Sequence, residues 1–163
     1  MNLTGAAIGA RDLTSGITDA QGEGTINDND SVGISIGDAV AVPEGGTATF
    51  TVALGAAAGT DVVVAYATAS GTATDGTDYV SAPSGSTVTI PQGSTTADIT
   101  VACTPDDSLV EQNENFYVNL TGAAIGARDL TSGITDTQGE GTINDNDSVG
   151  ISISADVPDR DAG

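Results

Sequence analysis

The chain contains no lysine, no histidine and no tryptophan, and it has a single cysteine. The absence of histidine excludes the commonest general base, the commonest zinc ligand and every histidine-dependent catalytic triad. The absence of lysine excludes Schiff-base chemistry. Cys103 alternates with Ile99 and Val101, so we expect a buried, inert thiol rather than a reactive one. We therefore predict that the protein is not an enzyme.

Positive charge is also scarce, because the chain has 3 arginines against 23 acidic residues and a net charge of −20. This balance argues against nucleic acid and anionic membranes as partners and favours cations. No apolar run is long enough for membrane insertion. Eighteen of the acids are aspartate, which is common in turns and in calcium loops. The alternative interpretation is a soluble surface in a salty medium, where negative charge resists aggregation.

The most informative feature that is present is a duplication. Residues Asn2–Ile36 recur at Asn119–Ile153 with one difference in 35 positions, Ala20 against Thr137. Such long, nearly identical repeats indicate whole domains in tandem. We expect residues 1–31 to be the C-terminal tail of a preceding repeat, residues 32–147 a complete repeat, and residues 148–163 the start of a following one. Met1 would then be an introduced start.

The complete repeat shows the alternation of an antiparallel β protein. Short runs of alternating apolar residues are separated by glycine, threonine, serine and aspartate. The expected strands are Val32–Ile36, Thr47–Leu54, Asp61–Thr68, Ser86–Ile90, Thr96–Cys103, Asn115–Leu120 and Gly139–Ile143. No stretch has helical periodicity. The pattern predicts an all-β protein in which seven strands form a two-sheet antiparallel sandwich. We interpret the polar segment Thr121–Gln138 as a loop over the last hairpin.

Four acidic residues, Asp106, Asp107, Glu111 and Glu114, fall within nine positions between two expected strands. Calcium takes six to eight oxygen ligands, and several carboxylates must converge on it. Like charges at this density repel one another unless a cation is present. A solvated acidic turn is the alternative interpretation.

Four motifs follow one another along the complete repeat: Pro43-Glu44-Gly45 before a strand, the stretch from Tyr66 to Tyr79, the acidic turn from Asp106 to Phe116, and the ending Asn144-Asp145-Asn146-Asp147. Together they resemble the Calx-β domain, a family found in sodium–calcium exchangers and in tandem arrays on large bacterial surface proteins. The resemblance implies an immunoglobulin-like sandwich that binds Ca²⁺ at one pole. Carried over residue by residue, it implies calcium ligands at Glu44, Asp78, Asp106, Asp107, Glu111, Glu114, Asp145 and Asp147, with a backbone carbonyl from Leu109.

The resemblance and the duplication together predict a calcium-stabilised structural repeat in the stalk of a large extracellular, adhesin-like protein of a bacterial surface or biofilm. Its partners would be calcium ions and neighbouring repeats of the same chain. At the repeat junction, Asp145 and Asp147 would either help to hold a stiffening metal or form a plain polar linker. Two other functions are a module that binds a glycan or protein through Thr121–Gln138, and a calcium sensor.

The isolated repeat is expected to be a monomer. Residues 1–27 lack most of the strand that precedes their copy in the complete repeat. We therefore expect this segment to be mobile, or to exchange strands with a neighbouring molecule at a sheet edge through residues 1–30.

Overall fold

The structure is a computed structural model of the whole chain. It describes residues 4, 7–8, 10–12, 15, 17–18, 21–25, 32–105 and 109–154. The chain divides into two compact units, Met1–Ser31 and Val32–Gly163. In the described ranges, no helix is long and apolar enough to cross a membrane.

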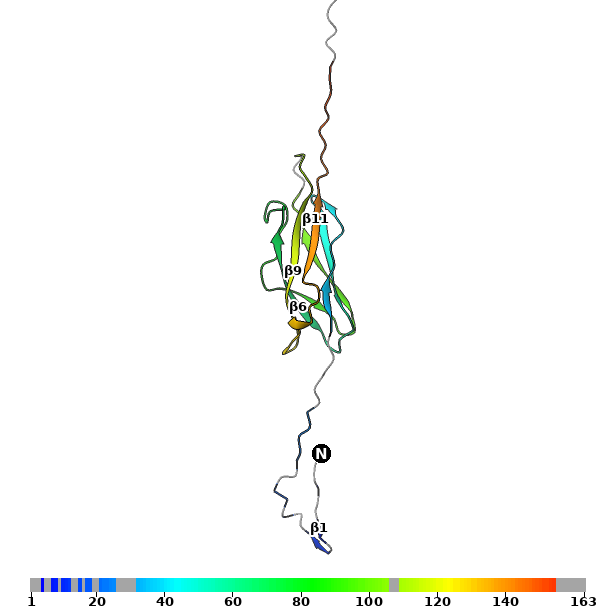
Figure 1. Cartoon of the computed structure of the whole chain (residues 1–163), viewed down its shortest axis with the longest axis vertical. Coiled ribbons are helices and arrows are strands. Elements are labelled where there is room, and N and C mark those ends of the chain that lie inside the picture. Colours follow the sequence, from blue (N-terminus) through cyan, green and yellow to red (C-terminus); the bar gives the residue numbers. More distant parts are fainter. Residues whose placement is uncertain are drawn as a thin grey trace, which may run out of the picture. The chain divides into compact units, whose positions relative to one another are not determined.

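The second unit contains two facing β-sheets (Figure 1). One sheet has three strands in the order β3 (Ile34–Ile36), β5 (Thr47–Leu54) and β8 (Thr96–Ala102). The other follows the order β4 (Val42–Pro43), β11 (Gln138–Asn144), β9 (Glu114–Ile125), β6 (Val62–Ser70) and β7 (Ser86–Ile90), and β10 (Arg128–Asp129) also pairs with β9. The predicted sandwich is confirmed, and each expected strand has its counterpart.

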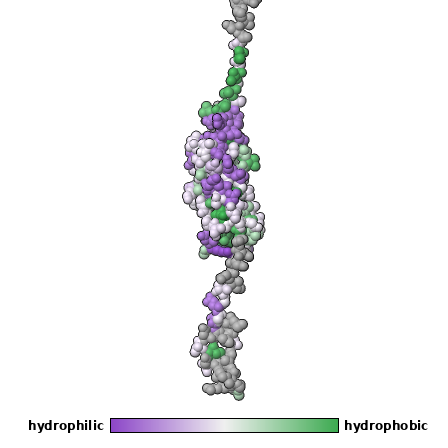
Figure 2. All heavy atoms as spheres, in the orientation of Figure 1, coloured by the Kyte–Doolittle hydropathy of each residue, from purple (hydrophilic) through white to green (hydrophobic). Residues whose placement is uncertain are grey.

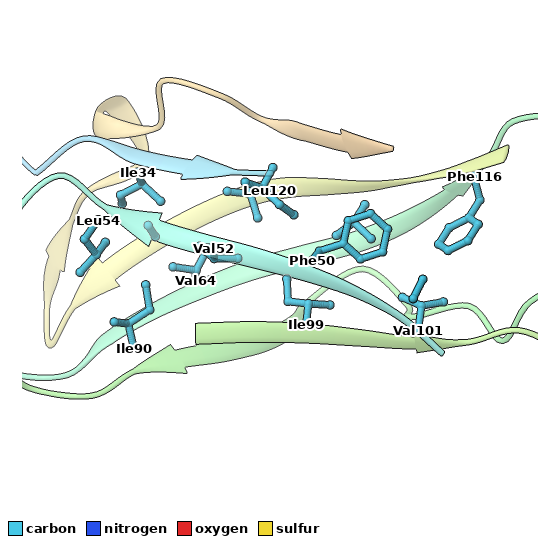
Figure 3. Packing of buried hydrophobic residues seen from close by; sticks show 14 of the residues in the cluster. Ile34, Phe50, Val52, Leu54, Val64, Ile90, Ile99, Val101, Phe116 and Leu120 are labelled. Carbon is cyan, nitrogen blue, oxygen red and sulfur yellow. The ribbon is translucent and has the colours of Figure 1, made fainter. Parts of the chain in front are cut away.

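The core lies between the two sheets because buried and outward-facing residues alternate along strands such as β5 and β8. On β5, Ala48, Phe50, Val52 and Leu54 are buried while the residues between them face outward. Val62 and Val64 of β6 and Phe116, Val118 and Leu120 of β9 cover the core from the other side. In Figure 3, Phe50, Val52 and Leu54 of β5 point into the same layer as Val64 of β6 and Phe116 and Leu120 of β9. Burial of this apolar surface is the main source of stability of the sandwich.

The first two strands of the sandwich belong to different sheets. β3 pairs antiparallel with β5, whereas β4, only a few residues later, pairs parallel with β11 in the opposite sheet. The chain therefore crosses from one sheet to the other between Gly37 and Ala41. This crossing brings the residues after β4 to the pole where β11 ends.

Two glycines allow the backbone of β11 to pack closely against the core. A Cβ atom on Gly141 would lie 2.7 Å from Phe116 Cζ and 2.9 Å from Phe50 Cζ, and one on Gly139 would lie 2.8 Å from the Gly37 carbonyl oxygen. Those two phenylalanine rings meet edge to face at 5.8 Å. Glycine is required here because the rings occupy the space of a side chain.

The interpretation of Thr121–Gln138 as a loop is wrong over much of its length. β9 continues to Ile125, turns at Gly126, whose φ is 55°, and returns as β10. A 3₁₀ turn, η2 (Thr131–Gly133), follows, and Leu130 before it is 6 % exposed. Glycine, alanine and threonine here give a weak strand pattern, yet the sheet extends through them because β6 offers a partner as far as Val63.

In the first unit, β1 (Ala7–Ile8) and β2 (Arg11–Asp12) form a short antiparallel hairpin. Gln21–Thr25 is exposed, and Gly22–Thr25 belongs to no strand. The predicted mobility or strand exchange of this segment involves many positions outside the described residues, among them 26–31, and stays a prediction. Residues 155–163, which were predicted to belong to the start of a following repeat, also lie outside the described residues.

Candidate metal centre

Four of the carboxylates that were predicted to bind a cation line one cavity at the pole where β11 ends. A cavity of about 230 Å³ opens there. Its walls come from five segments that are far apart in the sequence: Glu44, Gly76, Thr77, Asp78, Thr104, Pro105, Glu111, Glu114 and Ile143. Figure 2 shows hydrophilic residues gathered at this end of the sandwich, below the apolar segment that follows β11. The fold thus brings Glu44, Asp78, Glu111 and Glu114 together.

Asp78 is held by the tight loop that follows β6. Its Oδ2 accepts a hydrogen bond from the Thr74 amide at 2.6 Å, and its own amide donates to the Thr74 carbonyl at 2.9 Å. Gly76 has a φ of 79°, which a side chain would disfavour. The Thr104 amide donates to the Asp78 carbonyl at 3.0 Å, and the Thr104 hydroxyl donates to the Thr77 carbonyl. The carboxylate therefore sits on a loop that is closed on itself and tied to the segment after β8.

An aromatic pair fixes this loop against β9. Tyr79 is 1 % exposed, and its ring stacks on Phe116 with centroids 4.6 Å apart and an angle of 14°. The Tyr79 hydroxyl and Ser70 Oγ are 3.2 Å apart and share a hydrogen bond. Tyr79 follows Asp78, and Phe116 lies two positions after Glu114. Stacking inside the core consequently places the two carboxyl groups side by side at the surface.

Glu44 reaches the same cavity from the end of β4. Its amide donates to the Asn144 carbonyl at 3.3 Å, and the next amide, that of Gly45, donates to the Thr104 carbonyl at 2.6 Å. These bonds tie the segment after β4 both to β11 and to the residues after β8. The position of Glu44 thus depends on the crossing of the chain between sheets.

Crowding of negative charge changes the acidity of Glu114. Its pKa is raised from 4.5 to about 7, first by burial and then by Asp78, through both its charge and a side-chain hydrogen bond. The charges of Glu111 and Glu44 raise the pKa further. Each cause disfavours the ionised form. A bound cation would remove this penalty, because it would turn repulsion among the carboxylates into attraction.

The remaining predicted ligands are placed differently. Asp145 Oδ2 accepts from the Glu111 amide at 3.0 Å, and its Oδ1 accepts from the Asp147 amide at 2.9 Å. The Asp145 amide donates to Asn113 Oδ1 at 3.2 Å. Asp145 thus connects the end of β11 to the segment before β9, and Asp147 Oδ2 is shielded from solvent. Leu109 is 58 % exposed. Leu109, Asp145 and Asp147 do not line the cavity, and Asp106 and Asp107 lie outside the described residues.

The donor set around the cavity fits a hard cation. The four side chains that could bind a metal all offer carboxylate oxygens, which calcium prefers. Cys103, the one cysteine, is 6 % exposed and packed in the core, and burial raises the pKa of its thiol. Among the residues that the structure describes, no group of three or more histidine, cysteine or carboxylate side chains has the geometry to hold a metal ion. The residues around the cavity nevertheless match calcium in the type of ligand that they offer and in their shared location at one pole.

Sequence reasoning missed several residues that build this pole. Thr74 and Thr104 bind the Asp78 loop, and Asn115 makes side-chain hydrogen bonds to Thr72. The motif from Tyr66 to Tyr79 contained part of the signal, since an aspartate side chain that accepts from a nearby backbone amide, as Asp78 does from Thr74, is typical of such loops. No sequence pattern indicated the role of Asn115, because its hydrogen-bond partner Thr72 comes from another part of the chain.

The solved structures that this fold resembles include the Calx CBD1 and CBD2 domains and the calcium binding domain CBD12 of CALX1.1. The apo form of the Calx CBD1 domain has a TM-score of 0.60 and 22 % identity, over 72 % of this chain and 100 % of that one. The Calx CBD2 domain has a TM-score of 0.56 and 16 % identity, over 74 % and 91 %. The calcium binding domain CBD12 of CALX1.1 has a TM-score of 0.58 and 22 % identity, over 70 % and 44 %. At these identities the likeness concerns the fold.

Among curated protein sequences, none matches this chain. The family model of the Calx-beta domain, however, matches residues 25–147. This range covers every strand of the sandwich, from β3 to β11, and every carboxylate that lines the cavity. The chain belongs to the Calx-beta domain family.

Proposed function

We propose that residues 32–147 form a calcium-stabilised structural repeat. The observation that carries the proposal is the cavity lined by four carboxylates, in which burial and the neighbouring carboxylates raise the pKa of Glu114 to about 7. Calx-beta domains generally bind Ca²⁺ and are typically non-catalytic. A Ca²⁺ ion held by Glu44, Asp78, Glu111 and Glu114, together with Asp106 and Asp107, would order the acidic pole. Asp145, Asp147 and the Leu109 carbonyl would support the ion or the segments around it.

The duplication supports a role as a spacer. Near-identical copies provide length, whereas a switch would need only one responsive domain. We propose that residues 1–31 end a preceding repeat, that residues 148–163 begin a following one, and that neighbouring repeats of one chain are the partners of the domain. With a net charge of −20, the protein suits an extracellular surface rich in Ca²⁺, such as the stalk of an adhesin-like protein.

The strength of the effect follows from ligand linkage. An ion that binds only the folded state adds about 2.7 kcal/mol when its free concentration is a hundred times its dissociation constant. Mg²⁺ would add less, because it demands a tight octahedron and gives up its water reluctantly. Calcium should therefore raise the melting temperature of the full chain strongly and magnesium weakly.

Calorimetric titration of the full chain with Ca²⁺, together with melting curves in chelator, Ca²⁺ and Mg²⁺ at equal ionic strength, tests the proposal. Asp107→Ala and Glu111→Ala should remove most of the calcium response. Asp98→Ala, on the solvent face of β8, should keep it. Identical melting temperatures in chelator and in calcium would contradict the metal function, and equal losses in all three variants would indicate general charge screening.

A further inference from the structure

Asn115, at the start of β9, is hydrogen-bonded to the loop that carries Asp78. Its Oδ1 accepts hydrogen bonds from both the amide and the hydroxyl of Thr72, each at 2.9 Å. Its backbone amide donates to Thr72 Oγ1 at 2.8 Å, and its carbonyl accepts from the Ala73 amide at 2.9 Å. Four hydrogen bonds thus join one residue of β9 to two consecutive residues of the loop.

The side-chain nitrogen of Asn115 is hydrogen-bonded as well. Asn115 Nδ2 donates to the Tyr117 hydroxyl at 3.1 Å and to Glu140 Oε1 of β11 at 2.8 Å. With acceptors on its nitrogen and donors on its oxygen, the side chain has one satisfied orientation. Asn115 is therefore anchored to β9 and β11 while it holds the loop.

The fit between Asn115 and the loop is tight. A Cβ atom on Gly71 would lie 2.6 Å from both the carbonyl oxygen and Oδ1 of Asn115. Ala73, two residues further on, is fully buried. The loop then closes through the mutual hydrogen bonds of Thr74 and Asp78. A displacement at Thr72 would consequently be transmitted over a short, closed segment to the Asp78 carboxylate.

We propose that Asn115 is a positioning residue of the cation site. It holds the Asp78 carboxylate at a fixed place beside the carboxylate of Glu114, the residue that precedes Asn115 in β9. The inference rests on the proposed calcium function and adds to it a residue that binds no ion. Residues that orient metal ligands through hydrogen bonds typically change metal affinity by about 10–100-fold when they are removed. The structure offers a reason for such an effect here, because one side chain links both ligand-bearing segments.

The test compares Asn115→Ala with Asn119→Ala. Asn119 lies on the same strand, and its Oδ1 accepts a hydrogen bond from Gln138 Nε2 at 2.8 Å, so the control removes a similar cross-strand bond without touching the loop. Calcium affinity of the full chain is measured by calorimetry and stability by melting in chelator. We expect Asn115→Ala to weaken calcium binding about tenfold or more. Asn119→Ala should keep the wild-type affinity even if its melting temperature falls equally.

Thr72→Val provides a second variant in case Asn115→Ala fails to fold. It removes only the hydroxyl bonds, so its affinity should fall between those of wild type and Asn115→Ala. Wild-type calcium affinity in the folded Asn115 or Thr72 variants would overturn the inference and leave the calcium function intact. A wild-type chain that binds no calcium would instead overturn the proposed function, and the inference with it.

Discussion

Replacement of Glu114 by glutamine should have opposite effects in the absence and in the presence of calcium. Without the ion, Glu114 is a destabilising group at neutral pH, because burial and the charges of Asp78, Glu111 and Glu44 raise its pKa to about 7. Glutamine is isosteric and uncharged, so the variant lacks this penalty. With calcium, the same substitution removes a ligand. The variant should therefore be more stable than wild type in chelator and should respond weakly to calcium.

The sign of the pH dependence follows from proton binding. The unfolded chain releases the Glu114 proton near pH 4.5, whereas the folded protein holds it until about pH 7. Between these values the folded state binds more protons, so its stability falls as pH rises. A shift from 4.5 to about 7 corresponds to at most about 3 kcal/mol. Glu114 is partly exposed, and solvent screening reduces this to about 1–2 kcal/mol.

The assay is urea unfolding in chelator at pH 5 and pH 8, for wild type, Glu114→Gln and the control Asp98→Asn. Asp98 Oδ1 accepts from the Thr51 hydroxyl at 2.8 Å, and asparagine keeps that acceptor. The stability difference between Glu114→Gln and wild type should grow by about 1–2 kcal/mol from pH 5 to pH 8, whereas that of Asp98→Asn should stay constant. A difference for Glu114→Gln that is the same at both pH values would refute the reasoning about crowded carboxylates.

Two further predictions exploit the duplication. Gly141→Ala should destabilise the domain by about 1–3 kcal/mol in urea unfolding, because its Cβ would lie 2.7 Å from Phe116 Cζ. Gly24→Ala, at the copy of the same position, should be neutral, since a Cβ there meets nothing within 4 Å. Equal losses of stability in the two variants would contradict this account. In hydrogen exchange, the amides of Thr142 and Ile143 should exchange slowly and that of Thr25, the copy of Thr142, rapidly; equally strong protection in a dilute monomer would show that the tail is folded without a second complete domain.

Much of the sandwich could be predicted because alternation is a local property. On β5, every second residue is apolar and buried, so the sequence shows both the strand and the face that turns inward. The end of β9 could not be predicted in this way. Its residues Gly122–Ile125 are small or isolated apolar residues, and they form a strand because β6 and β10 pair with them.

The candidate site was predictable in its chemistry and less so in its construction. Aspartate and glutamate at strand ends suggested a cation site, and the fold brings Glu44, Asp78, Glu111 and Glu114 to one cavity. Composition alone, however, gave no indication that Tyr79 and Phe116 stack behind it. That contact joins residues 37 positions apart in sequence, so it depends on how the sheets pair.

The duplication separates what the sequence determines from what tertiary structure decides. The hairpin of β1 and β2 pairs Ala7 with Asp12 and Ile8 with Arg11, and the hairpin of β9 and β10 pairs the copies of these residues in the same register. Its turn and its partners lie within six residues, so the local sequence is sufficient to specify it.

The same sequences take different structures where partners are distant. Ile34 and Ile36 of β3 are 0 % and 3 % exposed, whereas their copies, Ile151 and Ile153, are 90 % and 94 % exposed and in no strand. Gly139–Thr142 belongs to β11, whereas its copy Gly22–Thr25 is irregular. The local sequence fixes the alternation and the short turns, but an isolated strand leaves its backbone unpaired and its apolar face in water. Only the tertiary structure, which supplies β5, β9 and β4 as partners, converts these residues into a sandwich with a charged cavity at its pole.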